Sequence, residues 1–147
     1  MSEFASVAAR ICAGDFTHEA MVEVVRDLIP SAVHGRDFLV GQHIGDDGEK
    51  DGDPFLLQWK LPDDEPDPAA LKEMFEADRE KYVGRLVRRL RDGLLEWSDG
   101  KADVPSDAPP SVQERAARWK SYRNALRNIP EQAGFPLNVE WPSVPDA

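Results

Sequence analysis

Two helices are predicted near the N-terminus, the second of them from apolar residues at helical spacing. A short helix is expected over residues 3–13, ended by Gly14. A second helix begins after Asp15 or Thr17, either of which can cap it, and stops before Pro30 because proline disfavours helical geometry at the preceding residue. The apolar stripe of this second helix consists of Met21, Val24, Val25 and Leu28.

Apolar and polar residues alternate along the next two stretches, Asp37–Ile44 and Phe55–Leu61, which predicts two strands. Residues 45–54 between them are too polar to bury, so the prediction is a β-hairpin with a long loop. A lone hairpin is marginally stable, and its apolar face must therefore pack on a helix or on another chain. The residues expected on that face are Phe38, Val40 and Ile44 of the first strand and Phe55, Leu57, Trp59 and Leu61 of the second.

An acidic, proline-rich linker from Pro62 leads to the longest predicted helix. Asp67 followed by Pro68 is a favourable start, since a cap residue precedes proline at the first helical position. Nothing interrupts the pattern strongly before Trp97, and about thirty residues of helix span about 45 Å. A stripe of this length must meet a later helix of the chain or a neighbouring subunit, as in a coiled coil. It consists of Leu71, Met74, Phe75, Tyr82, Leu86, Leu90, Leu94 and Trp97.

The last predicted helix follows a polar loop over residues 98–110. Ser111 and Glu114 have the spacing of a capping box, and the helix is expected to end near Asn128. Its apolar face consists of Val112, Ala116, Trp119, Tyr122, Leu126 and Ile129.

The chain ends in an extended, proline-punctuated arm. Its apolar residues occupy alternate positions, which places them on one side of a strand. Pro136 and Pro142 lack the N–H that a central strand needs, so an edge strand or a clamp is predicted. The alternating residues are Phe135, Leu137, Val139 and Trp141.

These elements define an α+β fold. A β-hairpin packs with helices, a long central helix forms a helical hairpin with the C-terminal helix, and an extended, proline-rich arm follows. We expect an N-terminal helix and hairpin module over residues 1–62, a linker and long helix over 63–98, and the C-terminal helix with its arm over 99–147. A chain of 147 residues fits one domain or two small lobes on a long helix.

Charge and composition narrow the classes of function. The net charge of −10 argues against a nucleic-acid binder. No stretch is long and apolar enough for a membrane span, and no secretory signal is recognised. Cys12 is the only cysteine, which fits a reducing cytoplasm. Basic residues gather in residues 79–91 and 115–127, either as solvated helix faces or as a surface that steers a partner of complementary charge.

No catalytic residue, metal site or cofactor is predicted. The chain has no nucleophile elbow, phosphate-binding loop or zinc-protease motif. The loop from Asp47 superficially matches a calcium loop with Gly52 at its sixth position, but Glu49 and Gln58 replace the usual third and twelfth ligands. A solvated hairpin loop and a weak cation site both remain open there. The three histidines, none at metal-ligand spacing, are His18, His34 and His43.

The C-terminal helix and arm combine a helix containing tryptophan, tyrosine and arginine, a proline stop and an aromatic tail. In this combination they resemble phage tail assembly chaperone proteins. This chain departs from the family at one point. The family usually has the order Ser-Asp-Trp before this helix, whereas here Trp97 precedes Ser98. The residues that carry the resemblance are Trp119, Tyr122, Arg123, Ile129-Pro130, Gly134-Phe135-Pro136 and Trp141-Pro142.

The N-terminal half has a helix ending in proline, a Gly-x-Asp-Phe strand, an acidic glycine-rich loop and a strand with a central tryptophan. In this order they are similar to XkdW-like and tail-fibre accessory proteins. The residues are Ile29-Pro30, Gly35-Arg36-Asp37-Phe38, the loop over 45–54, and Trp59, followed by Pro66-Asp67-Pro68.

The resemblance implies a non-enzymatic chaperone or accessory protein that binds and masks a phage tail or tail-fibre polypeptide in the host cytoplasm. Masking would cover apolar surface and open strand edges, with the arm from Gly134 adding to such an edge. The residues expected to bind the partner are Trp119, Tyr122, Arg123, Leu126, Arg127, Phe135, Trp141, Arg85 and Arg88.

Other interpretations remain open. The chain could be a permanent structural subunit of the virion tail or fibre, or an unrelated helical adaptor that binds an acidic partner through its basic helices. A homo- or hetero-oligomer fits each of these. The aromatic residues lie on predicted apolar faces, so they are either core residues or interface anchors.

Overall fold

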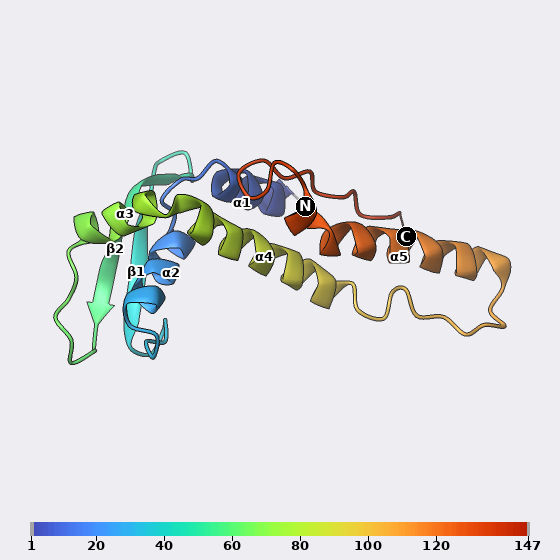
Figure 1. The fold of residues 1–147 in the computed structure, drawn as a ribbon, viewed down its shortest axis with the longest axis horizontal. Coiled ribbons are helices and arrows are strands. Elements are labelled where there is room, and N and C mark those ends of the chain that lie inside the picture. Colours follow the sequence, from blue (N-terminus) through green and yellow to red (C-terminus); the bar gives the residue numbers. More distant parts are fainter. Residues whose placement is uncertain (1, 147) are drawn as a thin grey trace.

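The computed structural model describes residues 2–146, with side chains described from Phe4 to Asp146, and the molecule is elongated (Figure 1). One end is a lobe of two strands with α2 and α3, and the other is the tip of a hairpin of α4 and α5. The predicted α+β fold is confirmed. The elements are α1 (Ser2–Cys12), α2 (His18–Leu28), β1 (Phe38–Ile44), β2 (Lys50–Trp59), α3 (Pro68–Ala77), α4 (Arg79–Trp97), α5 (Pro110–Arg127) and the 3₁₀ turn η1 (Ile129–Glu131).

A bulge in β2 changes which side chains face the core. The strands pair antiparallel, with Leu39 opposite Gln58 and Val40 opposite Leu56, so Leu57 is the extra residue. Leu56 packs against the core, whereas Leu57 is 65% exposed. The prediction that Leu57 lies on the core face is therefore wrong, because simple alternation does not anticipate the bulge.

The strand β2 begins earlier than the apolar pattern predicted. Ile44 pairs with Lys50, so only residues 45–49 connect the strands, and residues 50–54, which were predicted to belong to the loop, are part of β2. Backbone pairing, which the apolar pattern does not report, extends the strand. Ile44 is 69% exposed, so its predicted place on the core face is also wrong.

Two histidines cover the backbone of β1 at Val40. The Val40 N–H donates to His34 Nε2 at 3.3 Å, and the Val40 carbonyl lies 3.0 Å from His18 Nε2. Burial lowers the pKa of His34 below its ordinary value, and the nearby His18 adds to this. The neutral imidazole that accepts from Val40 is thus the favoured form, and these backbone groups are not free to pair with another strand.

The long helix predicted from Pro68 to Trp97 is wrong in one respect, since it is two helices. α3 ends at Ala77 and α4 begins at Arg79, because Asp78 leaves helical geometry with φ −140° and ψ 44°. Aspartate competes for backbone hydrogen bonds and is a poor helix former, so a break there is cheap. The change of direction lets α3 pack on α2 and β2 while α4 lies along α1, α2 and α5.

Side-chain caps set where two helices begin. Thr17 accepts a hydrogen bond from an N–H of α2, and Asp67 accepts one from an N–H of α3, each at 3.1 Å. The predicted caps at these two residues are confirmed. The capping box at Ser111 is wrong, because Ser111 already lies within α5. The helix begins at Pro110, a position that needs no N–H donor, and has no side-chain cap.

A continuous core links the lobe to the helical hairpin. It runs from between α2, the β-hairpin and α3 along the α4–α5 contact. Within residues 2–146, no helix is both long and apolar enough to cross a membrane. Fully buried side chains include Met21, Val24, Phe38, Phe75, Tyr82, Val87, Leu126 and Ile129.

The predicted strand in the arm is wrong. Residues 132–138 form turns, and residues 139–146 are extended without a strand partner. The Gln132 side chain closes this turn, since its amide donates to the Glu140 carbonyl at 2.9 Å and accepts from the Glu140 N–H at 2.8 Å. The arm then runs back over the helices, where Phe135, Val139 and Trp141 pack against the core and Leu137 is exposed (Figure 1).

Candidate partner-binding site

Trp119 and Tyr122 lie in an aromatic stack between α4 and α5. The Trp119 ring meets the Trp97 ring at 5.7 Å and the Tyr122 ring at 5.6 Å, both edge to face. Lys101 Nζ lies 5.1 Å from the Trp97 ring centroid and 5.2 Å from that of Trp119. Trp119 is 6% exposed and Tyr122 is 4% exposed, whereas Trp97 is 52% exposed. The exposed ring of this stack is therefore Trp97.

Arg123 closes the C-terminal end of α4. Its guanidinium donates to the Leu95 carbonyl at 2.6 Å, to Ser98 Oγ at 2.7 Å and to Asp99 Oδ1 at 2.8 Å. Ser98 is fully buried and donates in turn to the same Leu95 carbonyl at 3.1 Å. The last carbonyls of a helix lack partners within the helix, so Arg123 supplies one from α5 and joins the two helices.

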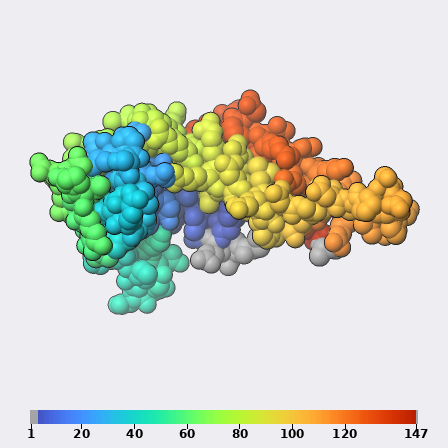
Figure 2. All heavy atoms as spheres, turned by 90° about the horizontal axis from the view of Figure 1, so that it is seen from below, coloured from blue at the N-terminus to red at the C-terminus, as the bar shows by residue number. Residues whose placement is uncertain are grey.

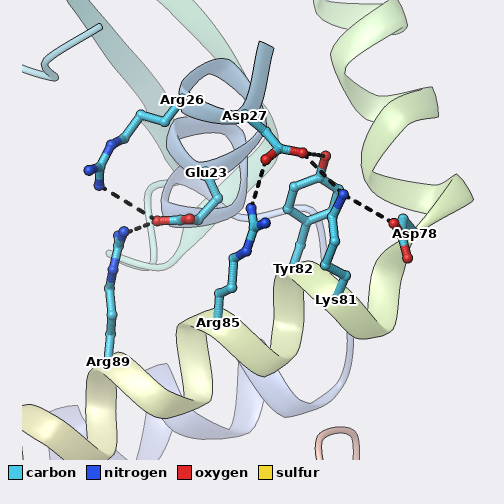
Figure 3. Close-up of polar contacts among 8 residues, drawn as sticks. All are labelled: Glu23, Arg26, Asp27, Asp78, Lys81, Tyr82, Arg85 and Arg89. Atoms are coloured by element: carbon cyan, nitrogen blue, oxygen red, sulfur yellow. Dashed lines mark hydrogen bonds and ion pairs between the residues drawn. The ribbon is translucent and has the colours of Figure 1, made fainter. Parts of the chain in front are cut away.

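Arg85 belongs to an ion-pair cluster between α2 and α4 (Figure 3). Asp27 accepts from Arg85 Nη1 at 3.0 Å, from the Tyr82 hydroxyl at 2.9 Å and from Lys81 Nζ at 3.1 Å. Lys81 also pairs with Asp78 at 3.1 Å, which ties the helix break to this cluster. Hydrogen bonds from Lys81, Arg85 and Tyr82 lower the pKa of Asp27 from 3.8 to about 2.

Glu23 lies one turn before Asp27 and is buried. Arg89 pairs with its carboxylate, and Arg26 approaches the same oxygen at 4.0 Å (Figure 3). A buried carboxylate is tolerated only when a cation compensates for its lost hydration. Three of the six basic residues over 79–91, Lys81, Arg85 and Arg89, thus pair with carboxylates of α2.

Acid should weaken the α2–α4 contact through Asp27. Because its folded-state pKa is lowered, the stabilisation is complete above about pH 4 and is lost as the pH falls through 2. The Asp27 side chain is 31% exposed, so about 1 kcal/mol is expected. The free energies of unfolding of wild type and Asp27→Asn, measured with urea, should differ by this amount at pH 6 and converge toward pH 2. Asp64→Asn, in the exposed linker, is the control and should show no such convergence.

Phe135 and Arg88 hold the turn of the arm against α4. The Arg88 guanidinium lies 4.9 Å from the Phe135 ring centroid. A Cβ atom at Gly84 would lie 3.5 Å from the same ring, so the glycine lets the ring approach the helix closely. These two predicted partner residues therefore contact each other within the chain.

Trp141 lines an open apolar groove between α1 and the arm, which we call the arm groove. Its ring meets the Phe4 ring edge to face at 5.4 Å. The groove has a volume of about 420 Å³, and Ala9, Cys12 and Val144 contribute to its walls. Burial raises the pKa of the Cys12 thiol, so this residue acts as an apolar wall rather than as a nucleophile.

A second hollow lies on the other side of the arm. Pro142, Ser143 and Val144 line both the arm groove and this hollow, whose other wall is formed by Arg118 and Ala125 of α5. The last described residues of the arm therefore lie between α1 and α5, as an extended peptide seated between two helices.

The structure places the predicted partner residues in two groups. Trp119, Tyr122 and Leu126 are buried in the core, and Arg123 holds α4 and α5 together. The other five predicted residues are at least partly exposed: Arg85, Arg88, Arg127, Phe135 and Trp141. Arg127 makes only a long hydrogen bond, of 3.5 Å, to Asn124. Their role in partner binding stays a prediction.

The groove residues of α1 were missed by the sequence analysis. Small side chains do recur there at helical spacing, at Ala5, Ala8, Ala9 and Cys12.

Metal ligands do not cluster in the described part of the chain. Among residues 2–146 no group of three or more His, Cys, Asp or Glu side chains could hold a metal ion. The segment that superficially matched a calcium loop is divided between the turn over 45–49 and the strand β2.

Fold and groove thus define a small α+β protein with a helical hairpin and an extended arm seated on it. Residues 84–146 match the phage tail assembly chaperone protein family, and residues 21–83 match the XkdW protein family. The two matches meet inside α4 and confirm the resemblance that the sequence motifs indicated, which relates this chain to phage tail assembly chaperones. They indicate a role in phage tail assembly. No curated protein and no solved structure matches the chain.

Proposed function

We propose that this chain is a non-enzymatic assembly chaperone that binds an apolar segment of a phage tail or tail-fibre polypeptide in the arm groove. The observation that carries the proposal is the pair of family matches over residues 21–146, joined to an apolar groove whose arm side, Val139 to Val144, lies within one of them and whose α1 side lies outside both. The groove already borders an extended peptide of the chain itself, the arm, so its shape suits another extended segment.

The mechanism proposed is masking by burial. A tail or fibre polypeptide exposes apolar surface before it assembles, and such surface promotes aggregation. Phe4, Trp141 and Val144 offer apolar contacts, and the Trp141 ring is only half-buried. Aromatic rings of this kind are frequent anchors of protein interfaces. Addition of the arm to a partner's strand edge is not part of the mechanism, because the arm is seated on its own helices.

Filling the groove should abolish partner binding without unfolding the chain. Ala9 is exposed on α1 and lines the groove, so Ala9→Arg places a long charged side chain in it while removing no core contact. Ala13→Arg carries the same change just beyond α1, outside the groove, and is the matched control. Each variant is co-expressed with the tail and fibre proteins of its phage, and the complex is isolated and identified by mass spectrometry.

We expect wild type and Ala13→Arg to retain a tail or fibre polypeptide at a fixed ratio and Ala9→Arg to lose it by at least about tenfold. Equal retention by both variants would reject the groove as the binding site. Mass spectrometry of mature particles then separates a transient chaperone from a permanent tail subunit. A subunit is present there in stoichiometric amount, whereas a transient chaperone is found only with unassembled polypeptide.

A further inference from the structure

Helix α1 is attached to the body of the molecule by apolar packing. Ala8 and Ile11 are its buried side chains, each 3% exposed, while Val7 and Cys12 pack on the core from partly buried positions. Among the described side chains, none from Phe4 to Cys12 forms a hydrogen bond or an ion pair with α2, α4 or the β-hairpin. By contrast, the ion pairs of Figure 3 join α2 to α4. The contacts that hold α1 are therefore few and non-directional.

Both sides of α1 border a hollow. Among the helices and strands of the described chain α1 packs only on α4, and Figure 2 shows α1, in dark blue, at the surface of the molecule. The arm groove lies along one side of the helix. A second hollow, of about 410 Å³, is lined by Ser6, Val7, Arg10 and Ile11 of α1 and by the hairpin turn at Gly48. Successive helical residues are about 100° apart, so these two sets of lining residues lie on opposite sides of α1. The helix can thus leave α4 without displacing a packed neighbour.

A short hinge connects α1 to the anchored part of the chain. Phe16 is buried, with its ring centroid 5.3 Å from that of Phe75, and Thr17 caps α2. Gly14, between α1 and Phe16, has a φ of +79°, a conformation that commonly ends helices and that glycine adopts without strain. Residues 13–15 are therefore the place about which α1 can turn.

The arm, which forms the other wall of the arm groove, is anchored more firmly. The Gln132 side chain makes two hydrogen bonds to the backbone of Glu140, and the Arg88 guanidinium lies over the Phe135 ring. Pro136, between these contacts, is buried. The two walls differ in how they are held, so α1 is the wall that is free to move.

We propose that α1 is a movable wall of the arm groove. It leaves α4 by turning about residues 13–15 while the rest of the chain stays folded, admits an apolar segment of the partner, and then packs on that segment. Phe4, Ala5 and Ala9 line the groove, so movement of α1 changes the width of the groove directly. Local opening is typical of elements with few buried apolar contacts. The role of α1 in partner entry rests on the proposed function, whereas the movement itself does not.

The test compares amide hydrogen exchange in wild type and two cavity variants of the full chain. Ile11→Ala removes the larger buried side chain of α1 and lies outside the arm groove. Val24→Ala is the matched control, since it makes a cavity in α2, which does not pack on α1. Mass spectrometry follows exchange in residues 8–12, in α2 and in α4, under conditions where the rate reports the opening equilibrium. Circular dichroism verifies the fold of each variant.

We expect Ile11→Ala to speed exchange in residues 8–12 by at least about tenfold, because it weakens the packing of α1 on α4. Val24→Ala should speed exchange of the slowest amides of α2 and α4 by at least about tenfold and leave residues 8–12 unchanged, since α1 opens without unfolding of the core. Two outcomes would overturn the proposal. One is that Val24→Ala speeds exchange in α1 as much as in α2, and the other is that Ile11→Ala leaves exchange in α1 unchanged.

Exchange is then measured on the complex that wild type forms with a tail or fibre polypeptide in the co-expression experiment. The bound segment should slow exchange in residues 8–12 by at least about tenfold, because α1 packs on it. A stable complex in which these residues exchange as fast as in the free chain would refute the closing of α1 on the partner. If no complex is retained, the proposed function and the role of α1 in partner entry fail together, while the rates in the free chain still decide whether α1 moves.

Discussion

Trp119→Ala should lower the free energy of unfolding by about 3–5 kcal/mol, the range for removing a large aromatic side chain from a core. Trp119 is 6% exposed and contacts both the Trp97 and Tyr122 rings, so its removal leaves a cavity between α4 and α5 that neither helix can close without moving. Small domains are stable by only about 5–15 kcal/mol, so this loss removes a large fraction of the total stability. Urea unfolding followed by far-ultraviolet circular dichroism measures this loss.

The matched control is Trp97→Ala in the same stack. Trp97 is 52% exposed, and its truncation should lower the free energy of unfolding by less than about 1 kcal/mol. If both variants lost equal stability, the assignment of Trp119 to the core would fail. The pair also separates folding from binding, because any loss of partner by folded Trp97→Ala must come from the surface.

Much of the fold could be predicted because the signals are local. Thr17 and Asp67 are cap residues next to helical patterns, and each caps the helix expected of it. The break at Asp78 could not be predicted in this way, since the apolar stripe continues through it. There, tertiary contacts decide: Phe75 and Tyr82 on either side of the break meet with ring centroids 6.0 Å apart. Similarly, the bulge at Leu57 depends on the register with β1 and has no signal within β2 itself.

The candidate site was harder to predict than the fold because its parts are distant in sequence. The arm groove joins α1 to residues 139–144, and the pattern of the arm alone favoured a strand. Gln132 closes the turn through its amide, a contact that no sequence motif specifies. Tryptophan and arginine near one another suit an interface and a core equally well. Only burial distinguishes the two, as it does for Trp119 and Trp97.

Arg123→Ala should lower the free energy of unfolding by about 3 kcal/mol, since it removes three hydrogen bonds that a charged, largely buried donor makes to the end of α4. The Leu95 carbonyl and Ser98 Oγ accept from this guanidinium at 2.6 and 2.7 Å, and Ser98 is fully buried. Arg127→Ala is the control on the same helix, where the side chain is exposed and the expected change is within about 0.5 kcal/mol. Hydrogen exchange gives a second readout, because loss of Arg123 should speed exchange of the last turn of α4 more than that of α2. Equal stability of the two variants would mean that Arg123 does not hold α4 to α5 and is free to serve a partner instead.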